Sequence, residues 1–201
     1  MTAPNLEIFQ LVNASANPPA LLVAAARFSA NWLIYVVIGG LVIGWVRGSG
    51  LTREQLIDAL ATAVLALLVN FAIAASWYHP RPFELGVGHQ LLPHAVETSF
   101  PSDHATVLFA ISFGLIQAGA ARFWSGIALL AAVIVAWARI YVGIHWPLDM
   151  AGSLVIALIG AWVIGRFSRL HVWKSVRRAL VRFTDLAVNA LRIPAWLYPR
   201  S

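Results

Sequence analysis

The 201-residue chain contains no cysteine and few charged side chains. The absence of cysteine excludes disulfide bonds, thiolate metal sites and cysteine nucleophiles. Charged residues make up 11% of the chain and apolar residues 60%, whereas soluble domains have roughly 25% and 45–50%. Because so few charges cannot cover the surface of a soluble fold, the composition excludes an ordinary cytosolic enzyme, a disordered chain and a soluble nucleic-acid-binding module. The sequence predicts an integral membrane protein.

Five apolar runs each come close to the ~20 residues that a helix needs to cross the hydrocarbon core of a bilayer. The predicted spans are Val23–Val46, Ala59–Trp77, Ala105–Ala121, Phe123–Ala138 and Met150–Gly165. Before them, residues 1–22 are predicted to hold a short interfacial helix and a turn. We therefore expect an all-α membrane protein with a bundle of five transmembrane helices, or a six-helix core if the N-terminal helix is counted.

The basic residues are distributed unevenly among the segments that join the predicted spans. Eleven of the fourteen fall in two connections and the C-terminal tail, which an odd number of spans puts on one side of the membrane. They are Arg47, Arg53, Arg122, Arg166, Arg169, Lys174, Arg177, Arg178, Arg182, Arg192 and Arg200. Because cytoplasmic loops carry an excess of Lys and Arg, this side is predicted to be cytoplasmic. The loops 78–104 and 139–149 are then predicted to face outward.

Residues 171–201 are predicted to form a basic amphipathic tail after the transmembrane domain of residues 23–170. Between His171 and Leu191, Trp173 and Phe183 stand among basic residues. This pattern is typical of a helix that lies on an anionic membrane surface. A nucleic-acid partner is not expected, because the tail has no recognisable binding module. The oligomeric state stays open.

Polar residues gather in three clusters, all in the loops predicted to face outward. The run His79-Pro80-Arg81-Pro82 follows the second predicted span, and Pro101-Ser102-Asp103-His104 precedes the third. The third cluster, between the last two spans, holds Arg139, His145 and Asp149. Their shared side makes these clusters the candidate functional site.

Ser102 has two interpretations. A Ser directly before an apolar helix is a standard N-cap. The same helix start also presents the backbone amides of Asp103 and His104, and amides at a helix N-terminus bind phosphate with the help of the helix dipole.

Arg81 and Arg139 also have two interpretations. A single arginine at the end of a span usually anchors the helix at the membrane interface. Two arginines on the side with few positive charges favour a second role, because guanidinium groups match phosphate oxygens in a bidentate way. Pro80 and Pro82 would stiffen the backbone beside Arg81.

His145 and Asp149 bracket Pro147, which suits the first position of a helix. In one interpretation Asp149 simply complements the helix dipole in the first turn. In the other, its carboxylate binds one nitrogen of His145, fixes the tautomer and leaves the second nitrogen as a nucleophile.

Three further histidines, His79, His89 and His94, lie in the loop after the second predicted span. Their spacing has no regular ligand geometry, so solvated loop histidines are favoured over a metal site. Glu84 and Glu97 in this loop either orient an arginine or are simply exposed. No metal is expected.

In this order and spacing, the clusters resemble the signature of the type-2 phosphatidic acid phosphatase superfamily. Its pattern is a Lys, six residues and Arg-Pro; then Pro-Ser-Gly-His; then Ser-Arg, five residues, His, three residues and Asp. The matching residues here are Arg81, Pro82, Pro101, Ser102, His104, Arg139, His145 and Asp149. The resemblance covers about residues 70–150. Within the superfamily, this stretch is similar in particular to the bacterial undecaprenyl-diphosphate phosphatase branch.

The sequence departs from the superfamily pattern at three positions. Ala74 stands where the pattern has its lysine, so one phosphate-binding cation is missing, and His79 is the candidate substitute. Asp103 replaces the glycine and would repel a phosphate unless its side chain points away. Ala138 replaces the serine before Arg139, which removes a hydroxyl but no charge.

The resemblance implies a phosphatase that needs no metal or other cofactor. His145 would attack the terminal phosphorus and form a phosphohistidine, with Asp149 orienting its ring. His104 would protonate the departing oxygen and later activate water. The phosphate oxygens would be held by Arg81, Arg139, Ser102, Asp103 and His79.

The branch resemblance also implies the substrate. A polyprenyl diphosphate lipid would be hydrolysed to the monophosphate, which recycles the carrier of peptidoglycan synthesis. The protein would sit in the bacterial inner membrane, with its active site at the extracytoplasmic interface. Another lipid phosphate, such as phosphatidylglycerophosphate, phosphatidate or lipid A, is the alternative substrate. A lipid transporter is less favoured, because five spans without inverted repeats do not match that class.

Overall fold

The computed structural model describes residues 2–191, 194 and 198, and the described residues fold into helices joined by loops. In chain order the helices are α1 (Ala3–Val12), α2 (Ala20–Asn31), α3 (Leu33–Arg47), α4 (Gly50–Ser76), the 3₁₀ helix η1 (Pro82–Leu85), α5 (Asp103–Gln117), α6 (Arg122–Tyr141), α7 (Pro147–Phe167) and α8 (His171–Ala190). The all-helical class predicted from the sequence is confirmed.

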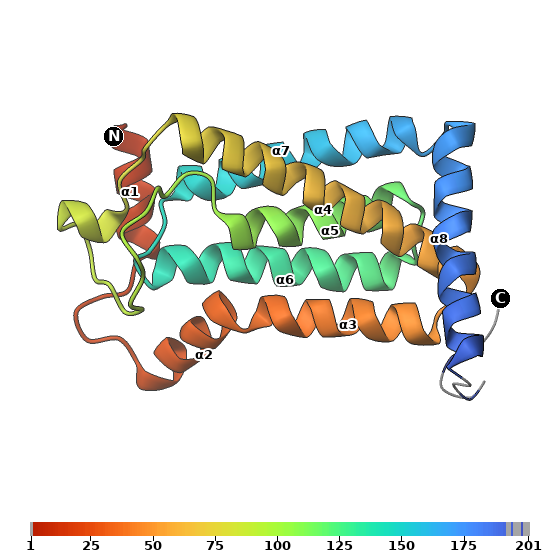
Figure 1. Cartoon of the computed structure of the whole chain (residues 1–201). Coiled ribbons are helices and arrows are strands. Elements are labelled where there is room, and N and C mark those ends of the chain that lie inside the picture. Colours follow the sequence, from red (N-terminus) through yellow and green to blue (C-terminus); the bar gives the residue numbers. More distant parts are fainter. Residues whose placement is uncertain (1, 192–193, 195–197, 199–201) are drawn as a thin grey trace.

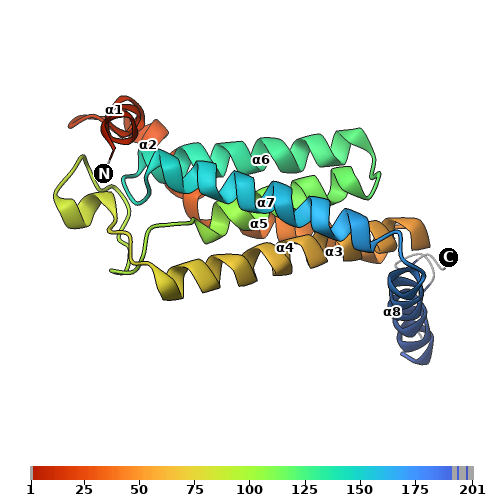
Figure 2. The ribbon, with the colours of Figure 1, turned by 90° about the horizontal axis from the view of Figure 1, so that it is seen from above.

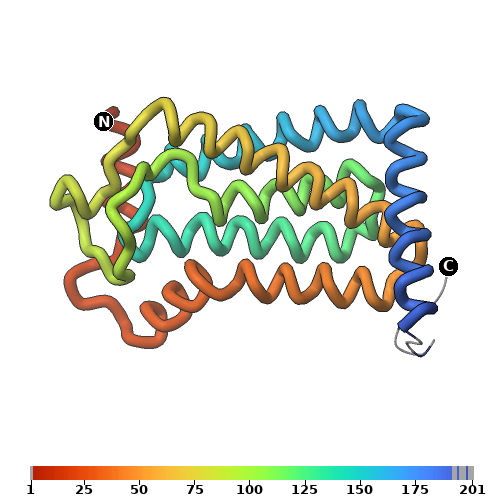
Figure 3. Tube along the Cα trace, viewed as in Figure 1, coloured from red at the N-terminus to blue at the C-terminus, as the bar shows by residue number. Residues whose placement is uncertain are grey.

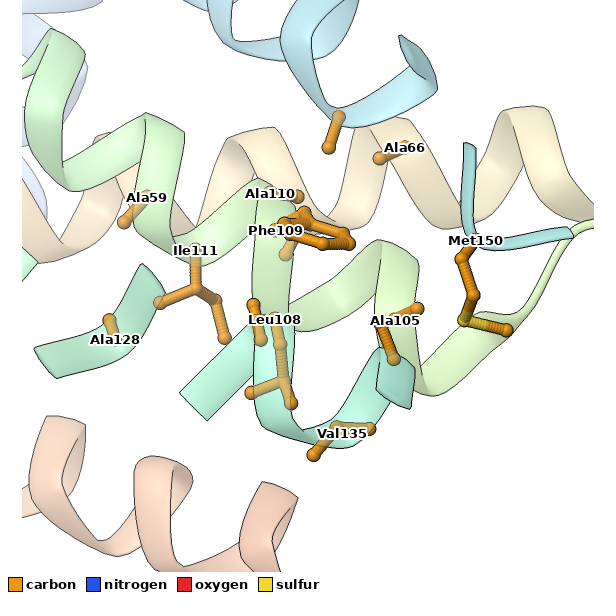
Figure 4. Close-up of a cluster of buried hydrophobic side chains, with 14 of the residues drawn as sticks. Ala59, Ala66, Ala105, Leu108, Phe109, Ala110, Ile111, Ala128, Val135 and Met150 are labelled. Carbon is orange, nitrogen blue, oxygen red and sulfur yellow. The ribbon is translucent and has the colours of Figure 1, made fainter. Parts of the chain in front are cut away.

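Helices α3 to α7 form the bundle, with α5 at its centre (Figures 1 and 2). α5 packs against α4, α6 and α7. Many side chains at these interfaces are small, including Ala59, Ala66, Ala105, Ala110 and Ala128, and larger ones such as Leu108 and Ile111 fill the space between (Figure 4). Small residues let helix backbones approach closely, which is how helices associate where lipid surrounds them.

Within the described residues, three helices, α4, α6 and α7, are long and apolar enough to cross a membrane. The pair α2 and α3 would add a fourth span, although the two helices meet at a bend of 51°, which is visible in the tube of Figure 3. The sequence predicted one continuous span there. α5 has 15 residues, or about 22 Å at 1.5 Å per residue, which is short for a ~30 Å hydrocarbon core. A fifth span therefore stays a prediction.

α4 begins nine residues before the predicted start of its span, at Gly50 instead of Ala59. Ser49 caps it by accepting a hydrogen bond from the backbone N–H of Thr52 at 3.2 Å. Its first turns contain Arg53 and Asp58, both buried against the rest of the protein. A hydropathy pattern locates the uncharged part of a helix. It therefore misses first turns that carry polar residues, even when the rest of the protein buries those residues.

α8 lies across one end of the bundle (Figures 1 and 2). Asp58 of α4 accepts hydrogen bonds from Trp173 Nε1 at 2.7 Å and from the guanidinium of Arg177. Arg53 donates to Asp185 at 3.1 Å. These partly buried polar contacts hold α8 against α4. Arg192 and Arg200 of the predicted tail lie outside the described residues.

The loop 77–102 and the turn 142–146 lie at the other end of the bundle, together with α1 (Figure 1). The candidate site residues and the basic tail are therefore separated by the length of the bundle. This is the arrangement that the alternation of basic and polar loops predicted.

The backbones of α4 and α5 approach each other closely at Gly114, so the stability of the protein should depend on this glycine. A Cβ atom at Gly114 would lie 2.6 Å from the Cα of Ala59, so Gly114→Ala forces the two backbones apart. We expect a loss of about 1–3 kcal/mol, as is usual for overpacking, seen as a lower thermal unfolding midpoint in detergent. Gly126→Ala in α6 is the matched control, because a Cβ there meets nothing within 4 Å. Equal midpoints for the two variants would contradict the close crossing.

Candidate active site

His145 occupies the short turn between α6 and α7 and is buried, with 2% of its surface exposed. Its Nδ1 lies 3.1 Å from Oδ2 of Asp149 in the first turn of α7. The same Oδ2 accepts a hydrogen bond from the backbone N–H of Trp146 at 2.8 Å, so Asp149 caps the helix as well. Both interpretations of Asp149 therefore hold: it closes the start of α7 and binds the histidine ring.

Two arginines converge on the other nitrogen of the same ring. Arg81 Nη1 is 3.1 Å and Arg139 Nη2 is 3.2 Å from His145 Nε2. A guanidinium group can only donate hydrogen bonds, so Nε2 must accept, and the ring proton must sit on Nδ1 facing Asp149. This tautomer leaves the lone pair of Nε2 aimed at the two cations.

The surroundings keep His145 uncharged. Burial lowers the pKa of His145 to about 3, and the nearby positive charges of Arg139 and Arg81 act in the same direction, against the opposing effect of Asp149. The ring is therefore neutral at physiological pH. A neutral imidazole with a fixed proton and a directed lone pair is the form required of a nucleophile.

Arg81 is held by the loop that surrounds it. Its Nη1 donates to the carbonyl of Ile144 at 2.9 Å, its Nε to the carbonyl of Glu97 at 3.1 Å, and its Nη2 to Thr98 O and Glu97 Oε1, both at 3.2 Å. The backbone N–H of Arg81 donates to Glu84 Oε2 at 2.7 Å. Both glutamates therefore orient the arginine, one of the two roles that the sequence left open.

Arg139 is held by the break between α2 and α3. Its Nη1 donates to the carbonyl of Ala30 at 3.0 Å. Carbonyls in the last turn of a helix have no partner within the helix, and Ala30 lies in the last turn of α2. Nε of Arg139 is buried and has no hydrogen-bond partner within the described part of the chain. This donor is thus enclosed by the protein beside the two nitrogens of Arg139 that make hydrogen bonds.

Ser102 caps α5 as the sequence predicted, with its hydroxyl facing the backbone N–H of Ala105 at 3.5 Å. Asp103 turns toward α4, where its Oδ1 accepts a hydrogen bond from Asn70 at 3.0 Å. Its carboxylate is thus engaged by an amide of another helix. The N–H groups of Asp103 and His104 stand in the first turn, where a helix has no internal acceptors for them.

His104 is half-buried in the same first turn of α5. The ionisable groups that act on it are Arg139 and His94. Two residues that contact His104 electrostatically, Arg139 and His94, are thus also neighbours of the His145 ring.

His79 lies next to Asp149, on the side of its Oδ1 atom. Its Nδ1 is 3.5 Å from Asp149 Oδ1, and its ring packs against Trp77 and Phe100. Within the described residues, no hydrogen bond or ion pair joins it to Arg81 or Arg139. Its predicted role as the substitute for the missing lysine stays a prediction, and its observed contact is with the carboxylate.

Two site residues were missed by the sequence analysis. Ser99 is fully buried, donates a hydrogen bond to Asp149 Oδ2 and lies 3.4 Å from His145 Nδ1. His94 Nε2 lies 3.4 Å from Arg139 Nη2. The interpretation as a solvated loop histidine is therefore wrong for His94 and fits only the exposed His89. No spacing signal marks either residue, because the irregular loop alone places them.

Comparisons with known proteins agree with this site. Residues 55–173, more than half of the chain, match the PAP2 superfamily, and they contain all three polar clusters. The chain belongs to the PAP2 superfamily.

Similar proteins within the superfamily include two that are named undecaprenyl-diphosphatases. YbjG of Escherichia coli (strain K12), provisionally named an undecaprenyl-diphosphatase, is 37% identical over 88% of this chain and 93% of its own length. The undecaprenyl-diphosphatase BcrC of Bacillus subtilis (strain 168) is 32% identical over 92% of this chain and 90% of its own. The crystal structure of Aquifex aeolicus LpxE shares the fold, with a TM-score of 0.64 and 24% identity over 81% of this chain and 95% of that one.

Ser99 provides a test of the site geometry. In Ser99→Ala the carboxylate of Asp149 loses one donor, so His145 is held less firmly and turnover of a lipid phosphate should fall about 10-fold or more, the size expected for a hydrogen bond to a charged group. Ser112→Ala is the matched control, because that buried hydroxyl only bonds the carbonyl of Leu108 within α5. Equal turnover in the two variants would show that Ser99 does not support the ring.

Proposed function

We propose that the protein hydrolyses undecaprenyl diphosphate to undecaprenyl phosphate and inorganic phosphate, and so regenerates a lipid carrier used in peptidoglycan synthesis. The observation that supports this best is the convergence of two buried guanidinium groups on the lone pair of His145 Nε2. A phosphoryl group in front of Nε2 would find its oxygens between these two cations. We take undecaprenyl diphosphate as the substrate because the similar proteins YbjG and BcrC are named undecaprenyl-diphosphatases.

In the first half-reaction, the lone pair of Nε2 attacks the terminal phosphorus. The bond from this phosphorus to the bridging oxygen breaks, and His104 gives its proton to the departing undecaprenyl phosphate. His145 is then a phosphohistidine, whose positive ring is stabilised by Asp149. Arg81 and Arg139 neutralise the charge that grows on the phosphoryl oxygens in the transition state.

In the second half-reaction, water replaces the lipid. His104, now neutral, takes a proton from the water while the water oxygen attacks the phosphorus. The bond to Nε2 breaks, inorganic phosphate leaves and His145 regains its lone pair. Both residues return to their starting protonation states, so the cycle balances.

The membrane setting agrees with this substrate. A polyprenyl chain is too apolar to leave the bilayer, so its head group must be met at the membrane surface. The site lies at one end of a bundle of membrane-type helices, which is where such a head group would be. Another lipid phosphate would fit the same chemistry, and a direct comparison of substrates separates them.

The first test uses the purified protein and a panel of lipids. Wild-type protein is expected to release phosphate from undecaprenyl diphosphate, in chelator as well as without it, and faster than from phosphatidylglycerophosphate, phosphatidate or lipid A. His145→Ala should abolish the release, because Nε2 of His145 is the atom that forms the bond to phosphorus. Activity that vanishes with chelator and returns with a divalent ion would refute the mechanism, and a strong preference for another lipid would refute the substrate.

The pH profile is a second test. Because burial lowers the pKa of His145 to about 3, the nucleophile is neutral above that pH and is lost only as the pH falls through that value. The acid limb of kcat/KM should therefore lie near pH 3, far below the usual range of histidine. Burial lowers the pKa of His104 in the free protein to about 4, so kcat/KM should fall as the pH rises above that value, and His104→Gln should remove this limb together with ~10²–10⁴-fold of the rate. A rate that rises steadily over roughly pH 5 to 9 would contradict these assignments.

We also propose that the bundle spans the bacterial inner membrane with the site end outward, α5 completing a set of five spans. The support is the grouping of basic residues at the end that α8 covers, which the positive-inside rule makes cytoplasmic. α8 itself would lie in the interface, since Val172, Val176, Phe183 and Leu186 are exposed on it beside a basic stripe.

Single thiols test this placement, because the chain has no cysteine of its own. In intact cells, an impermeant maleimide should label Val96→Cys in the site loop but not Arg178→Cys on α8. Permeabilised cells should add Arg178→Cys, whereas Phe183→Cys should stay protected by lipid. Labelling of Arg178→Cys from outside would reverse the orientation, and rapid labelling of Phe183→Cys would remove α8 from the interface.

A further inference from the structure

His94 contacts residues of the site but has no role in the two half-reactions. Its Nε2 is 3.4 Å from Arg139 Nη2, and its ring centroid is 6.3 Å from that of His145, edge to face. On its other side, Nδ1 is 3.1 Å from the carbonyl of Ala95 and 3.6 Å from Oε1 of Glu97. The side chain is 18% exposed, so it lines the site and remains accessible from outside.

The hydrogen bonds of His94 define its state in the free protein. The carbonyl of Ala95 can only accept, so the ring proton sits on Nδ1. Nε2 then presents a lone pair toward Arg139, which donates to it. A ligand that draws Arg139 away would leave Nε2 open to gain a proton from solvent and to face the ligand.

The site is short of one cation by comparison with its superfamily pattern. Ala74 stands at the lysine position on α4, and His79 is turned toward Asp149. Of the remaining histidines in the loop, His94 is the one that contacts a site arginine.

We infer that His94 supplies the third positive contact to the phosphoryl group, in place of the missing lysine. This inference rests on the proposed function and names a further phosphate-binding residue of the same site. In the free protein Nε2 accepts from Arg139. In the complex, Arg139 turns to the phosphate, Nε2 takes a proton from solvent, and the resulting imidazolium donates to a phosphate oxygen, with Glu97 balancing the charge through Nδ1.

The charges around His94 set the direction of its pH dependence. It is faced by Arg81, Arg139, Glu97, His104 and His145. Burial and the positive charge of Arg81 lower the pKa of His94 in the free protein, although Glu97 opposes them. A bound phosphate dianion adds negative charge and raises it. The contribution of His94 to phosphate binding is therefore full at low pH and is lost as the pH rises through the pKa of the complex.

The experiment measures inhibition by inorganic phosphate, a product that uses the same contacts without the lipid. The inhibition constant is determined for the wild type and for His94→Gln from pH 6 to pH 9, and the ratio of the two constants cancels the titration of phosphate itself. We expect His94→Gln to bind about 10-fold more weakly at pH 6, with the ratio approaching one at pH 9. His89→Gln is the control, since that exposed side chain lies in the same loop and should leave the ratio at one throughout.

A second variant keeps the test decisive if His94→Gln proves unstable. His94→Lys retains the charge at high pH, so at pH 9 it should bind phosphate more tightly than the wild type. A ratio for His94→Gln that stays at one, or that exceeds one without changing with pH, would overturn the inference. A wild-type protein that neither binds phosphate nor hydrolyses lipid phosphates would instead refute the proposed function.

Discussion

The structure depends on keeping two arginines and one carboxylate charged in a place with almost no water. Arg81, Arg139 and Asp149 are each at most 3% exposed. Burying an unpaired charge costs far more than a bundle of this size can offset, so each must be surrounded by hydrogen-bonding groups of the protein. The carbonyls of Ile144, Glu97, Thr98 and Ala30, with the hydroxyl of Ser99, provide them.

This requirement explains features that look irregular in a helical protein. The loop 77–102 is long because it must wrap its carbonyls around Arg81, and regular secondary structure would have used those carbonyls internally. The break between α2 and α3 serves Arg139 in the same way, because a continuous helix would have occupied the Ala30 carbonyl. Irregular backbone at the edge of a membrane bundle is tolerated where protein or a polar cavity covers it.

The parts of this site that depend on local position in a helix could be predicted from the amino-acid sequence. Ser102 as a cap and the pairing of His145 with Asp149 follow from position within a helix start, and the structure shows both. The PAP2 superfamily was likewise recognisable from motif spacing alone. Contacts made by irregular backbone were out of reach: nothing in the residues around Ser99 or His94 indicates where the loop folds back.

The length of α5 follows from the same constraint. Of the bundle helices around the site, α5 starts deepest, well inside the ends of α4, α6 and α7 (Figures 1 and 2). A helix that began level with its neighbours would extend into the polar end of the bundle, where the loop 77–102 lies. Because α5 is recessed, its first-turn amides, which have no acceptor within the helix, and His104 stand inside the polar end of the bundle. The short central helix and the buried charges therefore belong to one arrangement, in which α5 starts inside the bundle and the polar loop lies at that end.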